Sequence, residues 1–89
     1  MRAIVSVAGK DSVGIIAGIC VALAQNGVNV LDISQTVMQD FFTMNMLVDT
    51  ATSPVSFTEI AAALDEAGRE LAVSVRIQRE DIFEAMHRI

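Results

Sequence analysis

Four stretches of the chain alternate apolar and polar side chains with the two-residue period of a β-strand, and they cover residues 2–8, 29–38, 41–49 and 71–78. Only Gln39-Asp40 separates the second stretch from the third, so these two are expected to form a hairpin. In the second strand one face is expected to carry Leu31, Ile33, Gln35 and Val37, and the other Val30, Asp32, Ser34, Thr36 and Met38.

Two further stretches repeat apolar residues at helical spacing. Residues 12–26 do so with Ile16, Ile19, Cys20, Leu23 and Ala24, and Asn26-Gly27 is expected to end this helix. Ser56, with Glu59 three residues later, forms a capping box that opens a helix to about Ala67, where Gly68 is expected to stop it. A short C-terminal helix is predicted over about 80–88, with Ile82, Phe83 and Met86 on one side.

The resulting order, βαββαβ plus a C-terminal helix, predicts an α+β fold. We expect a ferredoxin-like sandwich, a four-stranded antiparallel sheet with both main helices on one face, forming a single domain over residues 1–89. The open face of that sheet would be part apolar and part polar, and would carry Ile4, Ser6, Asp32, Ser34, Thr43, Asn45, Leu47, Ser74 and Arg76.

Composition adds an expectation of self-association. Apolar residues make up 53% of the 89 residues and the mean hydropathy is +0.52, yet a domain this small buries only roughly 60–65% of its unfolded surface. A homo-oligomer, most simply a dimer, would cover the surplus apolar surface.

The net charge of −5 argues against nucleic acid or anionic lipid as a partner. No apolar run reaches the roughly 18–20 residues of a membrane span, and no signal peptide is recognisable, so a cytoplasmic location is expected.

Catalytic and metal-binding patterns are missing from the sequence. It has no Tyr or Trp, its one histidine is His87 near the C-terminus, and its one cysteine, Cys20, lies among apolar neighbours. A single cysteine allows neither an intrachain disulfide nor a cysteine-based metal site. Met44 and Met46 fit core packing better than a soft-metal site. We therefore expect neither catalysis nor a cofactor or metal.

The connection between the first strand and the first helix, Gly9 to Gly14, is the most informative stretch. Gly9 is expected to end the strand, and Asp11 and Ser12 are suitable residues for capping the helix start. Gly14 is expected in the first helical turn, where glycine costs helix propensity and so indicates close approach by another backbone or by a ligand. From chemistry alone this is either a capped connection or an anion-accepting helix start.

A resemblance to a known family bears on that choice. The segment Val7 to Ala17, with its Asp-x-x-Gly followed by two apolar residues, and Gly27-Val28-Asn29-Val30 resemble the opening of an ACT domain. The segments 32–36, 42–44 and 82–89 are similar to small stand-alone ACT proteins related to the glycine-cleavage-regulator type. Val13 departs from the pattern, because many ACT domains have proline there.

The resemblance implies a regulatory module that binds a small molecule, with amino acids as the expected class, and catalyses nothing. In that family, ligands lie where the first loop and helix start of one subunit meet strand 2 of another. Matched by position, the binding residues would be Lys10, Asp11, Ser12, Gly14, Asn29, Val30, Leu31 and Asp32. The alternative is a structural or protein-partner-binding subunit that uses these surfaces only for assembly.

Overall fold

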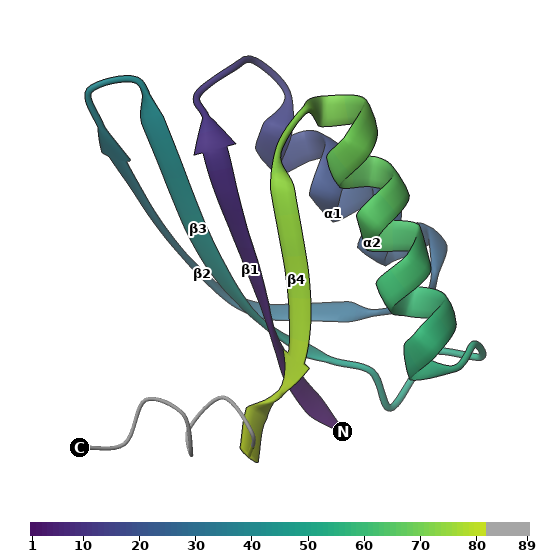
Figure 1. Ribbon diagram of the computed structural model, residues 1–89. Coiled ribbons are helices and arrows are strands. Elements are labelled where there is room, and N and C mark those ends of the chain that lie inside the picture. Colours follow the sequence, from purple (N-terminus) through teal and green to yellow (C-terminus); the bar gives the residue numbers. More distant parts are fainter. Residues whose placement is uncertain (82–89) are drawn as a thin grey trace.

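The computed structural model describes residues 1–81 and shows a four-stranded sheet with two helices on one face (Figure 1). In chain order the elements are β1 (Arg2–Lys10), α1 (Ile15–Gln25), β2 (Asn29–Met38), β3 (Phe41–Asp49), α2 (Phe57–Leu71) and β4 (Ser74–Arg79). The strands lie in the order β2-β3-β1-β4 and every neighbouring pair is antiparallel. The ferredoxin-like βαββαβ fold is therefore confirmed, whereas most of the predicted C-terminal helix falls on residues 82–89, outside the described residues.

The core lies between the central strands and the two helices. β1 and β3 are aligned so that Val5 is opposite Met46 and Val7 opposite Met44, and all four side chains are buried on the helix side. α1 and α2 contribute the apolar side chains that close this layer, Ile15, Ile19, Leu23, Ile60 and Leu64. The prediction that the two methionines fill the core is confirmed. Neither α1 nor α2 is long and apolar enough to cross a membrane.

The predicted start of α2 is confirmed, but its predicted end is wrong. Ser56 Oγ accepts a hydrogen bond from the backbone N–H of Glu59 over 3.2 Å, as a capping box requires. The helix then runs through Gly68 to Leu71 and ends at Ala72, which takes a left-handed conformation. Gly68 therefore lies inside the helix. A Cβ at this position would lie 2.8 Å from Val75 Cγ2, which explains why the residue is glycine. It serves close packing against β4, and β4 consequently begins at Ser74 rather than at residue 71.

β2 has the predicted bounds but not the predicted faces. Its pairing with β3 shifts between Val30 and Asp32, which leaves Leu31 as an extra residue in a bulge. Val30 therefore shares the helix-side face with Ile33 and its successors instead of the open face. Downstream of the bulge the prediction is correct, and so is the assignment of the other strands to the open face.

The helix layer leaves β2 uncovered. α1 scarcely contacts this edge strand, and every residue from Leu31 to Asp40 is exposed. Figure 1 shows the upper part of the β2–β3 hairpin standing clear of both helices. β2 places Ile33 and Val37 on its helix-side face, yet both side chains are exposed. Exposed apolar residues are unusual on an edge strand, because they invite pairing with another chain.

Replacing Gly68 tests the packing of α2 on β4. Gly68→Ala is expected to destabilise the fold by about 1–3 kcal/mol, because overpacking against Val75 and the Val73 carbonyl outweighs the gain in helix propensity. Gly18→Ala in α1 is the matched control, since its obstacle is the rotatable end of Leu71 and a smaller loss is expected. Urea unfolding measures both. Equal or greater stability for Gly68→Ala would show that the glycine has no packing role.

Candidate ligand-binding site

The β1–α1 turn starts later than predicted. β1 continues through Gly9 to Lys10, so Gly9 does not end the strand. A Cβ at Gly9 would lie 2.9 Å from Val73 Cγ1. The glycine therefore makes room for Val73, the residue just before β4, and does not bend β1. Lys10, Asp11 and Ser12 are all exposed at this end of the sheet.

Gly14, and not Asp11 or Ser12, is the N-cap of α1. It has φ +92°, and no side chain caps the helix start. The expected capping by Asp11 and Ser12 is wrong because the helix begins at Ile15 with Gly14 as its N-cap, and no side chain makes a capping hydrogen bond there. The expected place of Gly14 in the first turn is wrong for the same reason. A left-handed conformation is costly for residues with a Cβ, so glycine is required by the backbone here.

The start of α1 combines open space with the first amides of a helix. The first intrahelical hydrogen bond runs from Gly18 N–H to the Gly14 carbonyl over 2.8 Å, so the amides of residues 15–17 precede it. Apart from Gly14 itself and its neighbours in the chain, no atom lies within 4 Å of the position that a Gly14 Cβ would occupy. Val13 beside it is fully exposed, at 102%. The turn thus places the positive end of a helix dipole next to open space at Val13 and Gly14.

One contact that holds the turn is not visible in the sequence. The backbone N–H of Asp11 donates to the Asp40 carbonyl over 2.7 Å, which fastens the β1–α1 turn to the β2–β3 hairpin. Gln39, the neighbouring hairpin residue, has φ +58°. The polar pair Gln39-Asp40 marks the hairpin in the sequence, but nothing in it indicates this contact.

The other predicted residues lie at the start of β2. Asn29, Leu31 and Asp32 are exposed, and Val30 is half-buried. Asp32 Oδ1 accepts a hydrogen bond from the backbone N–H of Ile33 over 2.9 Å, which turns the carboxylate along its own strand. The bulge at Leu31 lies within this segment and bends the strand.

One chain does not bring the two halves of the predicted site together. Lys10 is paired with Phe41, whereas Asn29 is paired with Asp49 at the other end of β3. Eight strand residues at about 3.4 Å each separate those ends by about 27 Å. The residues can form one site only if the turn of one copy meets the β2 start of another.

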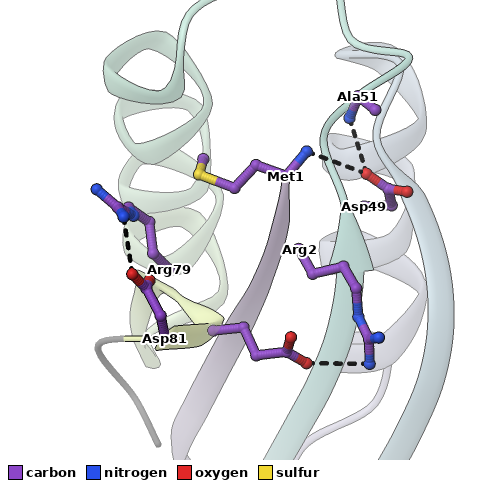
Figure 2. Close-up of a pocket in the computed structure, with 7 residues that line it drawn as sticks. Met1, Arg2, Asp49, Ala51, Arg79 and Asp81 are labelled. Carbon is purple, nitrogen blue, oxygen red and sulfur yellow. Dashed lines mark hydrogen bonds and ion pairs between the residues drawn. The ribbon is translucent and has the colours of Figure 1, made fainter. Parts of the chain in front are cut away.

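A pocket of about 590 Å³ lies at the β2-start end of the sheet, and Figure 2 shows the residues that line it. Its charged groups engage one another: the Met1 amino group lies 3.4 Å from Asp49 Oδ1, and Arg2 pairs with Glu80 over 3.0 Å. Arg79 likewise pairs with Asp81 over 2.8 Å. A charged ligand would have to displace these partners, so the pocket is less suited to binding than the open turn. Within residues 1–81 no cluster of side chains could hold a metal ion.

Asp49 is the pocket residue with a shifted pKa. The backbone N–H of Ala51 donates to Asp49 Oδ1 over 2.9 Å and is the main cause that lowers the pKa of this carboxyl below its ordinary value. The hydrogen bond and positive charge of the Met1 amino group act in the same direction. The carboxylate is therefore stabilised in the folded state relative to the unfolded chain.

Comparison with known proteins identifies the family. The family model for the ACT domain matches residues 2–78. The chain belongs to the ACT domain family. Among curated relatives, a UPF0237 protein of Clostridium acetobutylicum is 54% identical over 89 residues, covering 100% of both chains. A UPF0237 protein of Methanocaldococcus jannaschii is 52% identical over 88 residues, covering 99% of this ACT chain and 98% of the relative.

Solved structures agree with that assignment. An ACT domain protein from Streptococcus pneumoniae superposes with a TM-score of 0.81 at 40% identity, covering 94% of each chain. The regulatory subunit of aspartate kinase from Thermus thermophilus superposes with a TM-score of 0.67 at 27% identity, covering 86% of this chain and 50% of that one.

Substitution of Gly14 tests the left-handed helix start of this ACT domain. Gly14→Ala is expected to cost about 1 kcal/mol, because an L-residue with a Cβ is strained at this φ. Gly14→Asn is the control and should cost less, since asparagine tolerates the left-handed region. Chemical denaturation measures both losses. An alanine variant as stable as the parent would contradict the assigned conformation.

The lowered pKa of Asp49 predicts a particular loss of stability in acid. The carboxylate contributes stability above the unfolded pKa of about 3.9, and that contribution disappears as the pH falls through the lower folded pKa. Between pH 5 and pH 3, Asp49→Asn should therefore lose less unfolding free energy than the parent does. Asp65→Asn on α2 makes the same charge change away from the pocket. If Asp49→Asn and the parent have parallel pH profiles, the Ala51 hydrogen bond does not stabilise the carboxylate.

Proposed function

We propose that this ACT domain is a regulatory module that binds a small molecule, an amino acid as the first class to test, and that it acts as a homo-oligomer without catalysing a reaction. The observation that carries the proposal is the uncapped, unobstructed start of α1 at Gly14. The similarity to the regulatory subunit of aspartate kinase supports a regulatory role. The proposal takes residues 1–89 as one cytoplasmic domain.

The chemistry of the turn suits the two charged groups of an amino acid. A carboxylate is favoured at the amides of residues 15–17, where the helix dipole is positive. Lys10 at the end of β1 adds a positive charge at the same end of the sheet. Asp11 in the turn, or Asp32 of a second copy, supplies the negative charge that an ammonium group needs.

The proposed site is therefore divided between two copies. One copy provides Lys10, Asp11, Ser12 and Gly14, and the other provides the segment Asn29 to Asp32. This division follows from the separation of the two segments in one chain. The polar backbone of the turn would hold the charged part of the ligand, while Val30 and Leu31 would contact an apolar part.

The second candidate function is a structural or partner-binding subunit without a ligand. Its support is the exposed apolar surface of β2 and α1, which suits assembly whether or not a small molecule binds. Ligand binding separates the two candidates, because assembly alone requires no amino acid.

A thermal-shift screen against the amino acids tests the proposal. A ligand present at 100 times its Kd should stabilise the fold by about 2.7 kcal/mol, which raises the Tm by several degrees. Asp11→Ala should reduce that shift while leaving the ligand-free Tm nearly unchanged, since Asp11 does not cap α1. Asp65→Ala on α2 is the charge-matched control and should bind normally. If no amino acid shifts the Tm of the parent, the structural role is favoured instead.

A further inference from the structure

The open face of the sheet has an apolar row close to the end where the chain leaves β4. Ile4 on β1 is opposite Leu47 on β3, and both side chains are half-buried on this face. Gln78 on β4 and Asp32 on β2 complete the row at its two ends. Both helices lie on the other face (Figure 1), so within residues 1–81 neither α1 nor α2 covers this row.

The next row along the strands is polar and is satisfied within the sheet. Ser6 Oγ donates a hydrogen bond to Asn45 Oδ1 over 2.9 Å. Phe41, which is also on this face, lies at the hairpin end of β3, six residues or about 20 Å from Leu47. The apolar row at Ile4 and Leu47 is therefore a small and separate surface, which suits a short segment better than a whole second sheet.

The chain turns from β4 toward this row. Arg79 is opposite Ala3, and the next residue, Glu80, pairs with Arg2 over 3.0 Å. Arg2 shares the open face with Ile4, because the two residues are two positions apart on one strand. The ion pair therefore holds Glu80 on the open-face side, one row or about 7 Å from Ile4. Residues 80 and 81 have already left the strand and are helical.

The last eight residues of the sequence have an apolar side of matching size. Ile82, Phe83, Met86 and Ile89 recur at the spacing of one helix face. Acidic residues precede this segment and Arg88 is near its end, which favours a helix through the helix dipole. This is the C-terminal helix predicted for about 80–88, of which residues 82 onward lie outside the described residues.

We infer that residues 82–89 cover the row of Ile4 and Leu47 in their own chain, as a helix that crosses β1 and β3 on the open face. Eight helical residues span about 12 Å. Two strand spacings, from β4 across β1 to β3, amount to about 10 Å. The segment is thus long enough to cross both central strands from the place where Glu80 is held.

The charges of the segment match the sheet in this direction. Its acidic beginning follows Arg79 and lies beside Arg2, whereas its basic end arrives at β2, whose one charged residue is Asp32. Asp32 is opposite Leu47, so it belongs to the row that the segment covers. An exposed ion pair between Arg88 and Asp32 contributes little stability, but it favours this direction of the segment over the reverse.

The cover has a consequence for the proposed ligand site, and this step alone rests on the proposed function. That site has two candidates for the partner of a ligand ammonium group, Asp11 and Asp32. Because Arg88 engages Asp32 in the covered sheet, Asp11 in the β1–α1 turn is the carboxylate left to bind the ammonium. The open face, in turn, is closed by the chain itself and does not take part in ligand binding.

Disulfide cross-linking on the full chain tests the position of the segment. In a Cys20→Ala background, Leu47→Cys is combined in turn with Phe83→Cys and with Met86→Cys. Mild oxidation should join at least one of these pairs within a single chain of 9.5 kDa, as judged by denaturing, non-reducing mass analysis. Thr43→Cys, on the same face of β3 but four residues away, is the control and should join neither.

Two results of the cross-linking would overturn the inference. A disulfide between two chains would show that the segment covers the sheet of a neighbouring copy. Failure of both Leu47 pairs to oxidise, in protein that circular dichroism shows to be folded, would show that the segment lies elsewhere.

A double-mutant cycle measures the same contact without a cross-link. Phe83→Ala and Leu47→Ala should each lower the Tm by several degrees. The double variant should lose less than the sum of the two losses, because both substitutions remove one shared contact. Phe83→Ala with Thr43→Ala is the matched cycle and should be additive. Additive losses in the Leu47 cycle would contradict the cover.

The cover and the proposed ligand binding can fail separately, since the cross-linking and the cycle use protein without amino acids. A cross-linked segment in a protein that no amino acid stabilises would support the cover and contradict ligand binding. If an amino acid does bind, loss of its Tm shift in Asp32→Ala but not in Asp11→Ala would overturn the assignment of Asp11 as the ammonium partner.

Discussion

Close packing of the two helices against each other and against β4 determines most of this structure. A Cβ on Gly18 would lie 2.8 Å from Leu71 Cδ1, and one on Gly68 equally close to Val75 Cγ2. Glycine at both places lets α1 approach α2 and lets α2 approach β4. α1 has few contacts with β2, and β2 is exposed from Leu31 onward. The tight helix layer therefore covers the central strands and β4 more fully than it covers this edge strand.

Most of the fold could be predicted from the sequence because its signals are local. Alternation located β2 and β3 with the observed bounds, and the Ser56 capping box located the start of α2. The failures are glycines whose roles depend on residues distant in sequence. Gly68 has the appearance of a helix stop, yet it is retained for contact with β4. Gly14 has the appearance of a first-turn residue, yet its φ of +92° makes it the cap. A bulge at Leu31 likewise has no local signal.

The sequence could indicate the two segments of the proposed site but not where they lie relative to each other. The turn and the start of β2 are both recognisable in the sequence, whereas their separation of about 27 Å follows only from strand order and register. The contact between Asp11 and the Asp40 carbonyl uses backbone atoms, which any residue provides, so residue identity could not reveal it. That contact matters because it holds the turn beside the end of the uncovered strand.

In the proposed two-copy site, the start of β2 in one copy and the open helix start of the other would contact the same ligand. A ligand that contacts the turn of one copy and the β2 segment of the other binds the pair and not the separate chains. Such a ligand strengthens association, and association strengthens ligand binding by the same factor, because linkage between binding free energies is reciprocal. No internal hinge is needed for this coupling. A domain that leaves one edge strand exposed can therefore convert the concentration of a small molecule into a change of assembly.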